Sequence, residues 1–509
     1  MRSGFVSLVV LGFTISAAFG ANYYVNDAAT NGDIYCSAPG NNANSGTSPS
    51  TPTANVQPIC DLYDLEPGDV IWVDTGTYYP TNRYEAGHQF QFQKADGGSH
   101  EGYVTVQGST NAAAGGTTFI RDNPSYNHDV ISIYSSQCVR IRNVNLTRGT
   151  YGVHGKSSSN IVIESCHMYD NGSEGLYLRS CPDVYARNCT IYHNSGSGIR
   201  IFSGATRLHL ENCSIWNNHY DDSGGPLAEI YYDDGADLLA LTNTIIVASG
   251  TGHVCMHMDW FEMLPYYGNY NDLVALDNAF TAGYGISAAF RTLAEWQAAS
   301  GQDSNSIARD PMLTSDGYLM SKAGTWSNGT WVVYPTNSPC IDFGDPTDDA
   351  SGEPSPNGGR INIGAFGGTG QASKSADTDA DGLFDVRERY EYGTDPDNAD
   401  TDDDGYDDFS ELVAGTGPGD GGSFFDMSGA ALHDDTAFEL SWYGRSGRTY
   451  RAQWKTDLRD ARWTNCENLV DPYGHSVGEV TGSNGWVTAR DTDWTRETNR
   501  TYRIRVTRP

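Results

Sequence analysis

The residues of this chain best suited to chemistry lie in short segments that repeat every 22 to 24 positions between residues 138 and 218. After a Gly turn, runs such as "GLYL" and "GIRI" alternate apolar and polar residues, as strands do. We take as inward-facing Val153, Leu176, Ile199 and Ala228. The outward residues then stack as His154, Tyr177, Arg200 and Glu229, and beside them Lys156, Arg179, Phe202 and Tyr231. A face that combines bases, acids and rings favours acid–base chemistry over a merely solvated surface.

Two kinds of reaction suit these residues. Lys156 is a candidate base, because desolvation beside Arg179 lowers the pKa of a lysine; two surface cations without a role are the alternative. Paired carboxylates suit hydrolysis instead, and the candidates are Glu229, Asp233 and Asp234. The two aspartates belong to an insertion after position 218 that interrupts the repeat, where carboxylates also serve as turn formers.

A second outward row consists of aromatic residues: Tyr169, Tyr192 and Trp216. Stacked rings of this kind offer apolar faces on which sugars can lie. Strengthening of the strand edges is an equally good interpretation. A third row, Arg142, Glu164, Arg187 and Glu211, alternates in sign and predicts a structural ladder of ion pairs.

An acidic stretch after residue 376 matches calcium-loop chemistry twice, at a spacing of 23 residues. In each half, acids occupy loop positions 1, 3, 5 and 9, a Gly makes the turn at position 6, a carbonyl is available at position 7, and Glu closes position 12. The predicted ligands of the first loop are Asp377, Asp379, Asp381, Leu383, Asp385 and Glu388. Those of the second are Asp400, Asp402, Asp404, Tyr406, Asp408 and Glu411. The sequence therefore predicts Ca²⁺ as a cofactor, with an acidic unstructured linker as the alternative.

The repeat itself predicts the fold class, which is all-β with a parallel β-helix. Three short strands per unit make one coil, and like residues of successive coils stack about 4.8 Å apart. Cys166, Cys189 and Cys213 recur at intervals of 23 and 24 residues and predict, with Val144, a ladder of small buried side chains. A second ladder of hydrogen-bonded amides is predicted at Asn171, Asn194 and Asn218.

Composition and termini restrict the partners. Residues 1–20 read as a signal peptide, and no later apolar run approaches a membrane span, so we expect a secreted, extracellular or cell-surface protein without a membrane partner. The formal net charge of −33 argues against nucleic acid. We expect a monomer with a polysaccharide substrate or ligand.

Several segments resemble known families. "LEPGDVIWVDTGTYY" near the start and "SPCIDFGDPTDDASGEPSPNGGRINIGAFGGTG" near residue 370 are similar to the first and last segments of secreted β-helix proteins, many of them carbohydrate-active. This resemblance implies a right-handed parallel β-helix over residues 21–370. "HGKSSSN" resembles the setting of the base in alginate and chondroitin lyases, which implies a Lys156 base and Arg179 one coil later. The acidic calcium ligands of those lyases are replaced by Gly149 and Tyr151, and the G-H-G and R-I-K signatures of pectin hydrolases are absent.

The C-terminal part resembles other families. "GTDPDNADTDDDG" is similar to thrombospondin type-3 repeats, which implies a calcium-stiffened spacer over residues 371–420, with Asp395 and Asp397 joining the coordination. Residues 421–509 resemble fibronectin-III-like modules and predict a small β-sandwich. Its expected core aromatics are Trp442, Tyr450, Trp454 and Trp463.

Two functional hypotheses follow. The first is an extracellular enzyme that acts on an acidic polysaccharide, a lyase rather than a glycoside hydrolase. Its candidate catalytic residues are Lys156, Arg179, Tyr177, His154 and Arg200. The second is a surface, adhesive or carbohydrate-binding β-helix without catalytic activity.

Overall fold

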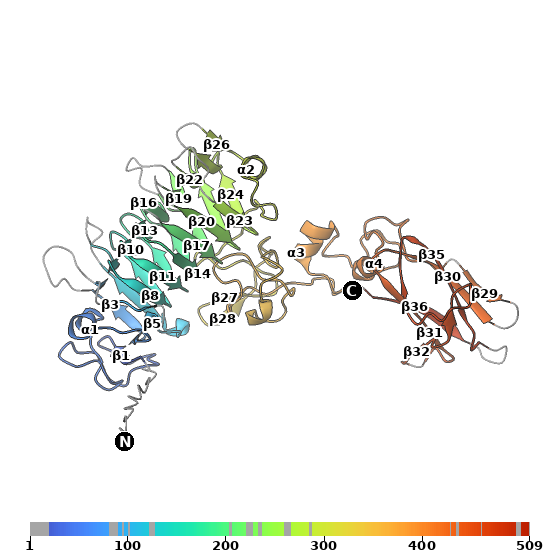
Figure 1. Cartoon of the computed structure of the whole chain (residues 1–509), viewed down its shortest axis with the longest axis horizontal. Coiled ribbons are helices and arrows are strands. Elements are labelled where there is room, and N and C mark those ends of the chain that lie inside the picture. The colour runs from blue at the N-terminus through green and yellow to red at the C-terminus, as the bar shows by residue number, and fades with distance from the viewer. Residues whose placement is uncertain are drawn as a thin grey trace, which may run out of the picture. The chain divides into compact units, whose positions relative to one another are not determined.

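The chain folds into two units, residues 1–374 and residues 375–509 (Figure 1). The structure is a computed structural model that describes residues 20–80, 90–93, 96–99, 102–121, 128–202, 206–219, 227–232, 237–258, 266–284, 288–427, 429–433, 437–459, 461–494 and 500–507. All of the predicted signal peptide except Gly20 lies outside these residues. Among them, no helix has the length and apolar character that crossing a membrane requires.

The first unit is a parallel β-helix, as predicted, built from three sheets that we call A, B and C. Within each sheet, strand numbers mostly rise by three, because each coil contributes one strand to each sheet. Sheet A contains β1 (Asn22–Val25), β2 (Val70–Val73), β5 (Val104–Gly108), β8 (Gln137–Arg142), β11 (Ser159–Glu164), β14 (Val184–Arg187), β17 (Arg207–Glu211), β20 (Leu238–Thr242) and β23 (Tyr266–Asn269).

Sheets B and C run beside it. Sheet B contains β3 (Gly76–Tyr78), β6 (Thr117–Ile120), β9 (Val144–Thr147), β12 (His167–Tyr169), β15 (Thr190–Tyr192), β18 (Ser214–Trp216), β21 (Ile245–Ser249) and β24 (Asp272–Leu276). Sheet C contains β4 (Phe90–Phe92), β7 (Ile131–Tyr134), β10 (Val153–Lys156), β13 (Leu176–Arg179), β16 (Ile199–Phe202), β19 (Ala228–Tyr232), β22 (Val254–Met258), β25 (Phe280–Tyr284) and the antiparallel β26 (Ala288–Phe290). Figure 1 shows these strands stacked in register along the first unit.

The interior of the coil is filled as the repeat predicts. Cys166, Cys189 and Cys213 are fully buried free thiols, and each donates a hydrogen bond to a backbone carbonyl two residues before it. The residues that precede them include Asn188 and Asn212, which adopt φ values near +50° at the turn from sheet A to sheet B. Asn tolerates this left-handed conformation better than most residues, which explains the recurring N-C phrase.

Remaining elements of the first unit cover its ends and edges. Helix α1 (Gln57–Leu62) buries Ile59 against the first coils, and η1 (Ala112–Ala114) is a single turn. Helix α2 (Leu293–Ser300) begins with a capping box at Thr292 and buries Trp296, whose indole donates to Asp303 at 3.0 Å. The hairpin β27 (Thr325–Ser327) and β28 (Thr330–Val332) and the turn η2 (Ala350–Gly352) complete the unit.

On the outside of sheet A, the predicted ion pairs join neighbouring coils: Arg142 contacts Glu164 at 2.8 Å, and Arg187 contacts Glu211 at 3.0 Å. Ion pairs at this exposure contribute about 0.2–1 kcal/mol each, so the ladder fixes register more than it stabilises the fold.

The second unit combines three short helical elements with two antiparallel sheets. The helical elements are α3 (Asp385–Arg387), the π-helical turn η3 (Glu388–Tyr392) and α4 (Asp408–Ala414). One sheet contains β29 (Gly429–His433), β30 (Ala437–Gly444), β35 (Gly485–Asp491) and β33 (Leu469–Val470). The other contains β32 (Thr464–Asn465), β31 (Thr449–Lys455), β34 (Val480–Thr481) and β36 (Thr501–Thr507).

The core of this β-sandwich confirms part of the aromatic prediction. Trp442 and Tyr450 are fully buried, and Trp454 packs against them while partly exposed. The expectation for Trp463 is wrong: its ring lies outside this cluster, with the cationic groups of Lys455 and Arg503 each 4.4 Å from the ring centroid. A ring held between two cations is stabilised at the surface, where those charges stay hydrated.

Candidate functional site

The outward row on sheet C forms as predicted over three coils. His154 pairs with Tyr177, and Tyr177 with Arg200, in the parallel register of β10, β13 and β16. Lys156 pairs with Arg179, and Arg179 with Phe202, in the neighbouring row. The five predicted catalytic residues therefore share one face of the β-helix, which we call the sheet C face.

The predicted register of the next coil is wrong. Ile199 pairs with Ile230 rather than with Ala228, so Tyr231, and not Glu229, stands next to Arg200 in the first row. Tyr231 is buried, in contact with Val254. It thus closes the sheet C face on this side instead of offering a ring to a ligand.

Glu229 has a different role from the predicted one, because it occupies the position held by Gly152, Gly175 and Gly198 in the earlier coils. At Gly198 a Cβ would lie 2.7 Å from the amide nitrogen of Asn218, whereas Glu229 directs its side chain to that amide from the other end of the same turn. Glu229 is 3% exposed, and its carboxylate accepts from Asn218 Nδ2 at 2.7 Å.

The predicted asparagine ladder thus ends on a carboxylate. Asn171 Nδ2 donates to Asn194 Oδ1 at 2.9 Å, and Asn194 Nδ2 donates to Asn218 Oδ1 at 2.8 Å. Glu229 supplies the acceptor that a further Asn would supply. Burial raises the pKa of Glu229 to about 8. This carboxylate is part of the interior and is not available to a substrate on the sheet C face.

His154 is held by a group that the sequence did not point out. Its Nδ1 lies 2.8 Å from Oδ2 of the buried Asp129, and its side chain is 14% exposed. The same carboxylate oxygen accepts from the hydroxyl groups of Ser132 at 2.9 Å and Tyr134 at 3.0 Å. Asp129 therefore orients the imidazole and favours the tautomer that carries the proton on Nδ1, leaving Nε2 basic.

Three tyrosine rings surround this histidine. Tyr134, Tyr151 and Tyr177 have their ring centroids 4.9, 5.0 and 5.0 Å from that of His154, all near edge-to-face. Tyr151 and Tyr177 also stack on each other at 4.7 Å. The rings fix the imidazole and place phenol groups beside it.

The three cations of the sheet C face differ in their surroundings. Arg200 lies 3.7 Å from the buried Glu174 and 5.0 Å from the ring centroid of Tyr231. Lys156 and Arg179 are exposed, and among the described residues neither has a carboxylate within 4.0 Å. Because Lys156 is exposed, it lacks the burial on which its predicted role as a base depends.

The other predicted ligand-binding residues lie elsewhere. Asp233 and Asp234 are outside the described residues. Tyr169, Tyr192 and Trp216 form the predicted row, but on sheet B: Tyr192 stacks on Tyr169 at 5.3 Å and on Trp216 at 4.5 Å. Gly317 lies against the edge of the half-buried Trp216 ring, and the two tyrosines, but not Trp216, line an open groove.

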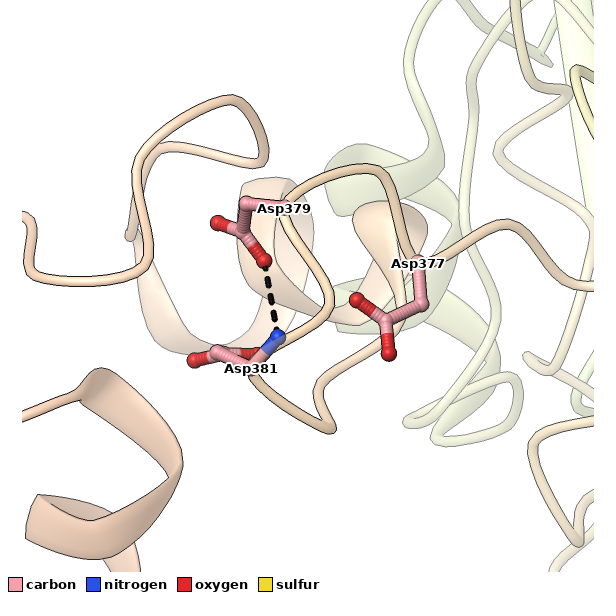
Figure 2. Close-up of side chains that lie close together, drawn as sticks. All are labelled: Asp377, Asp379 and Asp381. Carbon is pink, nitrogen blue, oxygen red and sulfur yellow. Dashed lines mark hydrogen bonds between the residues drawn. The ribbon is translucent and has the colours of Figure 1, made fainter.

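The acidic loops of the second unit bring their first three acids together. Figure 2 shows Asp377, Asp379 and Asp381 around one turn of the chain. One carboxylate oxygen from each lies within 4.8 Å of the others, and the same holds for Asp400, Asp402 and Asp404. Gly382 and Gly405 have φ values of +103° and +97°, a turn that favours glycine at loop position 6.

Buried carboxylate oxygens test whether these loops suit a cation. Glu388 and Glu411 are 0% and 2% exposed, although neither has a cationic partner among the described residues. Oε2 of Glu388 and both carboxylate oxygens of Glu411 have no hydrogen-bond donor there. Burial and the neighbouring aspartates raise the pKa of Glu388 to about 8 and that of Glu411 to about 7. An all-oxygen donor set with unpaired buried carboxylates fits a hard divalent cation.

Other predicted calcium ligands have additional partners or lie apart. The carboxylates of Asp385 and Asp408 each accept from the backbone amide and the hydroxyl of a threonine at the start of the loop. Asp395 and Asp397 are exposed. Leu383 and Tyr406 follow the turn glycines, and each backbone amide donates to the aspartate at loop position 5. Their coordination of a metal stays a prediction.

Comparison with known proteins agrees with the fold. The family described as "Right handed beta helix region" matches residues 94–254. No curated protein matches the chain in sequence.

Solved structures with a similar arrangement include three lyases. Pectate lyase Pel9A is 16% identical with a TM-score of 0.37, over 68% of this chain and 96% of that one. A rhamnogalacturonan lyase is 12% identical with a TM-score of 0.37, over 63% and 97%. An alginate lyase from Paenibacillus sp. str. FPU-7 is 15% identical with a TM-score of 0.31, over 41% and 70%. At these identities, the activity of this chain has to be argued from its own residues.

Proposed function

We propose that the β-helix binds an acidic, uronate-containing polysaccharide on the sheet C face and cleaves it by β-elimination. The observation that carries the proposal is the position of the His154–Asp129 pair next to two exposed cations, Lys156 and Arg179, that have no carboxylate partner among the described residues. An acid–base group beside an unfilled anion site is what this reaction needs.

Charge supports an anionic ligand. The chain carries 31 basic and 64 acidic residues, so repulsion keeps a polyanion away from most of its surface. On the sheet C face, however, Lys156, Arg179 and Arg200 stand on three successive coils. Cations beside a uronate carboxylate would also stabilise the negative charge that develops when the adjacent carbon loses its proton. That proton therefore becomes more acidic.

Each proton transfer of the elimination has a candidate side chain on the sheet C face. Nε2 of His154 accepts the proton from the carbon next to the carboxylate, and the electron pair of that C–H bond forms the new C=C bond. The bond to the glycosidic oxygen breaks with its electron pair, and that oxygen takes a proton from a phenol, for which Tyr177 is the candidate. Lys156, the base expected from sequence, serves instead with Arg179 as a carboxylate-binding cation.

Product analysis tests this proposal. The purified protein is incubated with alginate, polygalacturonate, chondroitin sulfate and rhamnogalacturonan, while ultraviolet absorbance of the unsaturated product and new reducing ends are both measured. We expect both signals with at least one polymer, and His154→Ala and Arg179→Ala should abolish them. Arg187→Ala, which removes a cation from sheet A, is the matched control and should retain activity.

Three results would contradict the proposal. New reducing ends without absorbance would indicate hydrolysis. Binding without either signal would indicate a non-catalytic β-helix. Full activity of His154→Ala would move the site away from the sheet C face.

For the second unit, we propose two calcium sites that stiffen a spacer before the β-sandwich. The support is the set of buried, unpaired carboxylate oxygens of Glu388 and Glu411 next to the two aspartate clusters. Bound Ca²⁺ supplies positive charge that offsets the repulsion among these acids. We expect a chelator to lower the first melting transition and calcium, but not the same concentration of sodium, to restore it. A melting curve that does not respond to the chelator would contradict this assignment.

We also propose that the protein is exported and acts outside the cell. The support is the basic and apolar character of residues 1–20. Recovery of a mature protein that begins at Ala21 in the culture medium would test it, and retention of the full chain inside the cell would contradict it.

A further inference from the structure

The β-helix has a second groove, which runs over the outer side of sheet B. The chain returns across this sheet after its last coil, and the space left between has a volume of about 830 Å³. Residues of the returning segment form one wall, and outward side chains of sheet B strands form the floor. This volume lies within the range of pockets that hold organic ligands.

The floor is made by stacked tyrosines and their polar neighbours. Tyr169 and Tyr192 are parallel, with an interplanar angle of 8°, so their faces cover each other and their edges and hydroxyl groups border the groove. Next to them His167 is fixed by a 2.6 Å hydrogen bond between its Nδ1 and the hydroxyl of Thr190. Burial lowers the pKa of His167 and keeps it neutral.

The wall is rigid and aromatic. Tyr318 stacks on Phe366 at 3.7 Å and donates its hydroxyl to Gln371 Oε1 at 2.9 Å. Asn188 ties this wall to the floor, because its Nδ2 donates to the backbone carbonyls of Ala365 at 3.0 Å and Gly367 at 2.9 Å. The groove is therefore preformed, which lowers the entropic cost of binding.

Charge distinguishes this groove from the sheet C face. Among the described residues that line it, Asp316 is the only acid and there is no lysine or arginine. The polar lining is instead made of amides and hydroxyls, including Asn145 and Asn328. The amides and hydroxyls match the hydroxyl groups of a neutral sugar, and the ring edges offer apolar contacts to its C–H groups, whereas a polyanion would find no counter-charge.

We propose that the sheet B groove binds an uncharged oligosaccharide or an uncharged stretch of a polysaccharide. It is a binding site and not a catalytic one. The groove would hold a neutral glycan on sheet B, and its lining differs in charge from the cationic sheet C face. The proposal does not depend on β-elimination at the sheet C face.

Calorimetric titration of the full-length protein tests it. The probes are cello-, xylo-, manno- and galacto-hexasaccharides, with the hexasaccharide of polygalacturonate as the charged counterpart. At least one neutral probe should bind, and added salt should leave that affinity unchanged, whereas binding of the charged probe weakens with salt.

The variants separate the groove from the rest of the surface. Tyr169→Phe combined with Tyr192→Phe keeps the stacked rings and removes two hydroxyl groups, and should weaken binding about tenfold. Phe366→Ala, which removes half of the wall stack, should weaken it further. Tyr267→Phe is the control: this tyrosine is 59% exposed on sheet A and should have no effect.

Failure of this proposal is distinct from failure of the elimination proposal, because binding and product formation are measured separately. No saturation with any neutral hexasaccharide at millimolar concentration would overturn it. Equal affinity of the double tyrosine variant and the parent would also overturn it, and this result does not depend on whether Phe366→Ala folds.

Discussion

Replacing Glu229 by Gln should stabilise the β-helix, and more so as the pH rises. Glu229 is buried at the end of the asparagine ladder and accepts two hydrogen bonds from Asn218, one from the backbone and one from the amide. A neutral amide oxygen performs the same task in the coils before it, at Asn194 and Asn218. The substitution therefore keeps the acceptor and removes the ionisable group.

The magnitude follows from the pKa of Glu229, which burial raises from 4.5 to about 8. The folded state binds the proton more tightly than the unfolded state, so stability is greatest below pH 4.5 and falls as the pH rises to about 8. Each pH unit in this window costs about 1.4 kcal/mol. At pH 7 the wild-type β-helix should therefore be about 3 kcal/mol less stable than the variant, and at pH 4 the two should be nearly equal.

Calorimetric melting of wild type and variant in the same buffer measures the effect. The informative quantity is the difference in Tm between Glu229→Gln and wild type at pH 5 and pH 8. Glu211→Gln is the matched control, because its carboxylate is 43% exposed in the sheet A ion-pair ladder and its loss should cost little at either pH. A Tm difference that stays the same between pH 5 and 8, or a variant less stable at pH 8, would refute the reasoning.

Further measurements address the other parts of the chain. Asp129→Asn should lower product formation about a hundredfold through misorientation of His154 while leaving KM nearly unchanged; a parallel rise in KM would indicate lost substrate binding instead. Asn194→Ala should destabilise the β-helix by about 3 kcal/mol in denaturant, because it leaves buried hydrogen-bonding groups of two coils unpaired; a loss below 1 kcal/mol would show that water replaces the amide. Glu411→Ala should remove one equivalent of bound calcium by titration, while Arg448→Ala, which removes hydrogen bonds to the last carbonyls of α4, should retain both; loss of calcium in both variants would indicate that the unit had unfolded.

The interior of the β-helix could be predicted from the sequence because every coil solves the same packing problem. Cys166 and its counterparts fill one slot per coil, and Asn171 repeats because each amide needs an acceptor in the next coil. Both signals are periodic. The pairing of Lys156 with Arg179 follows from the same periodicity, since residues 23 apart fall in register.

Sequence reasoning failed where the period changes. Leu176 and Ile199 are 23 positions apart, but Ile199 and Ile230 are 31 apart. The prediction placed Ala228, instead of Ile230, next to Ile199. Alignment of "EIYY" with "GIRI" would have found the register, but it places Glu in a position otherwise held by Gly.

Contacts between distant segments were also out of reach. Asp129 lies in the coil before the recognised repeats, so its approach to His154 required the alignment of "HDVISIY" with "TYGVHGK". Phe366 reaches sheet B only because the chain returns across it after the last coil, as the bond from Asn188 shows. No local pattern near either residue carries that information.

The end of the asparagine ladder explains where the coil can accept extra residues. Each rung joins a sheet B strand to the following sheet C strand, and an Asn in one coil requires an acceptor at the same place in the next. The turn after Asn218 is the long one, and Glu229 stands at its far end, 11 positions on, whereas Gly198 follows Asn194 by four positions. Once Glu229 supplies the final acceptor, that requirement ends, and the following coil has no Asn at the equivalent position, where Ser249 is exposed. The final acceptor therefore comes from the coil of Asn218 itself, so the ladder ends without a partner residue from the coil that follows.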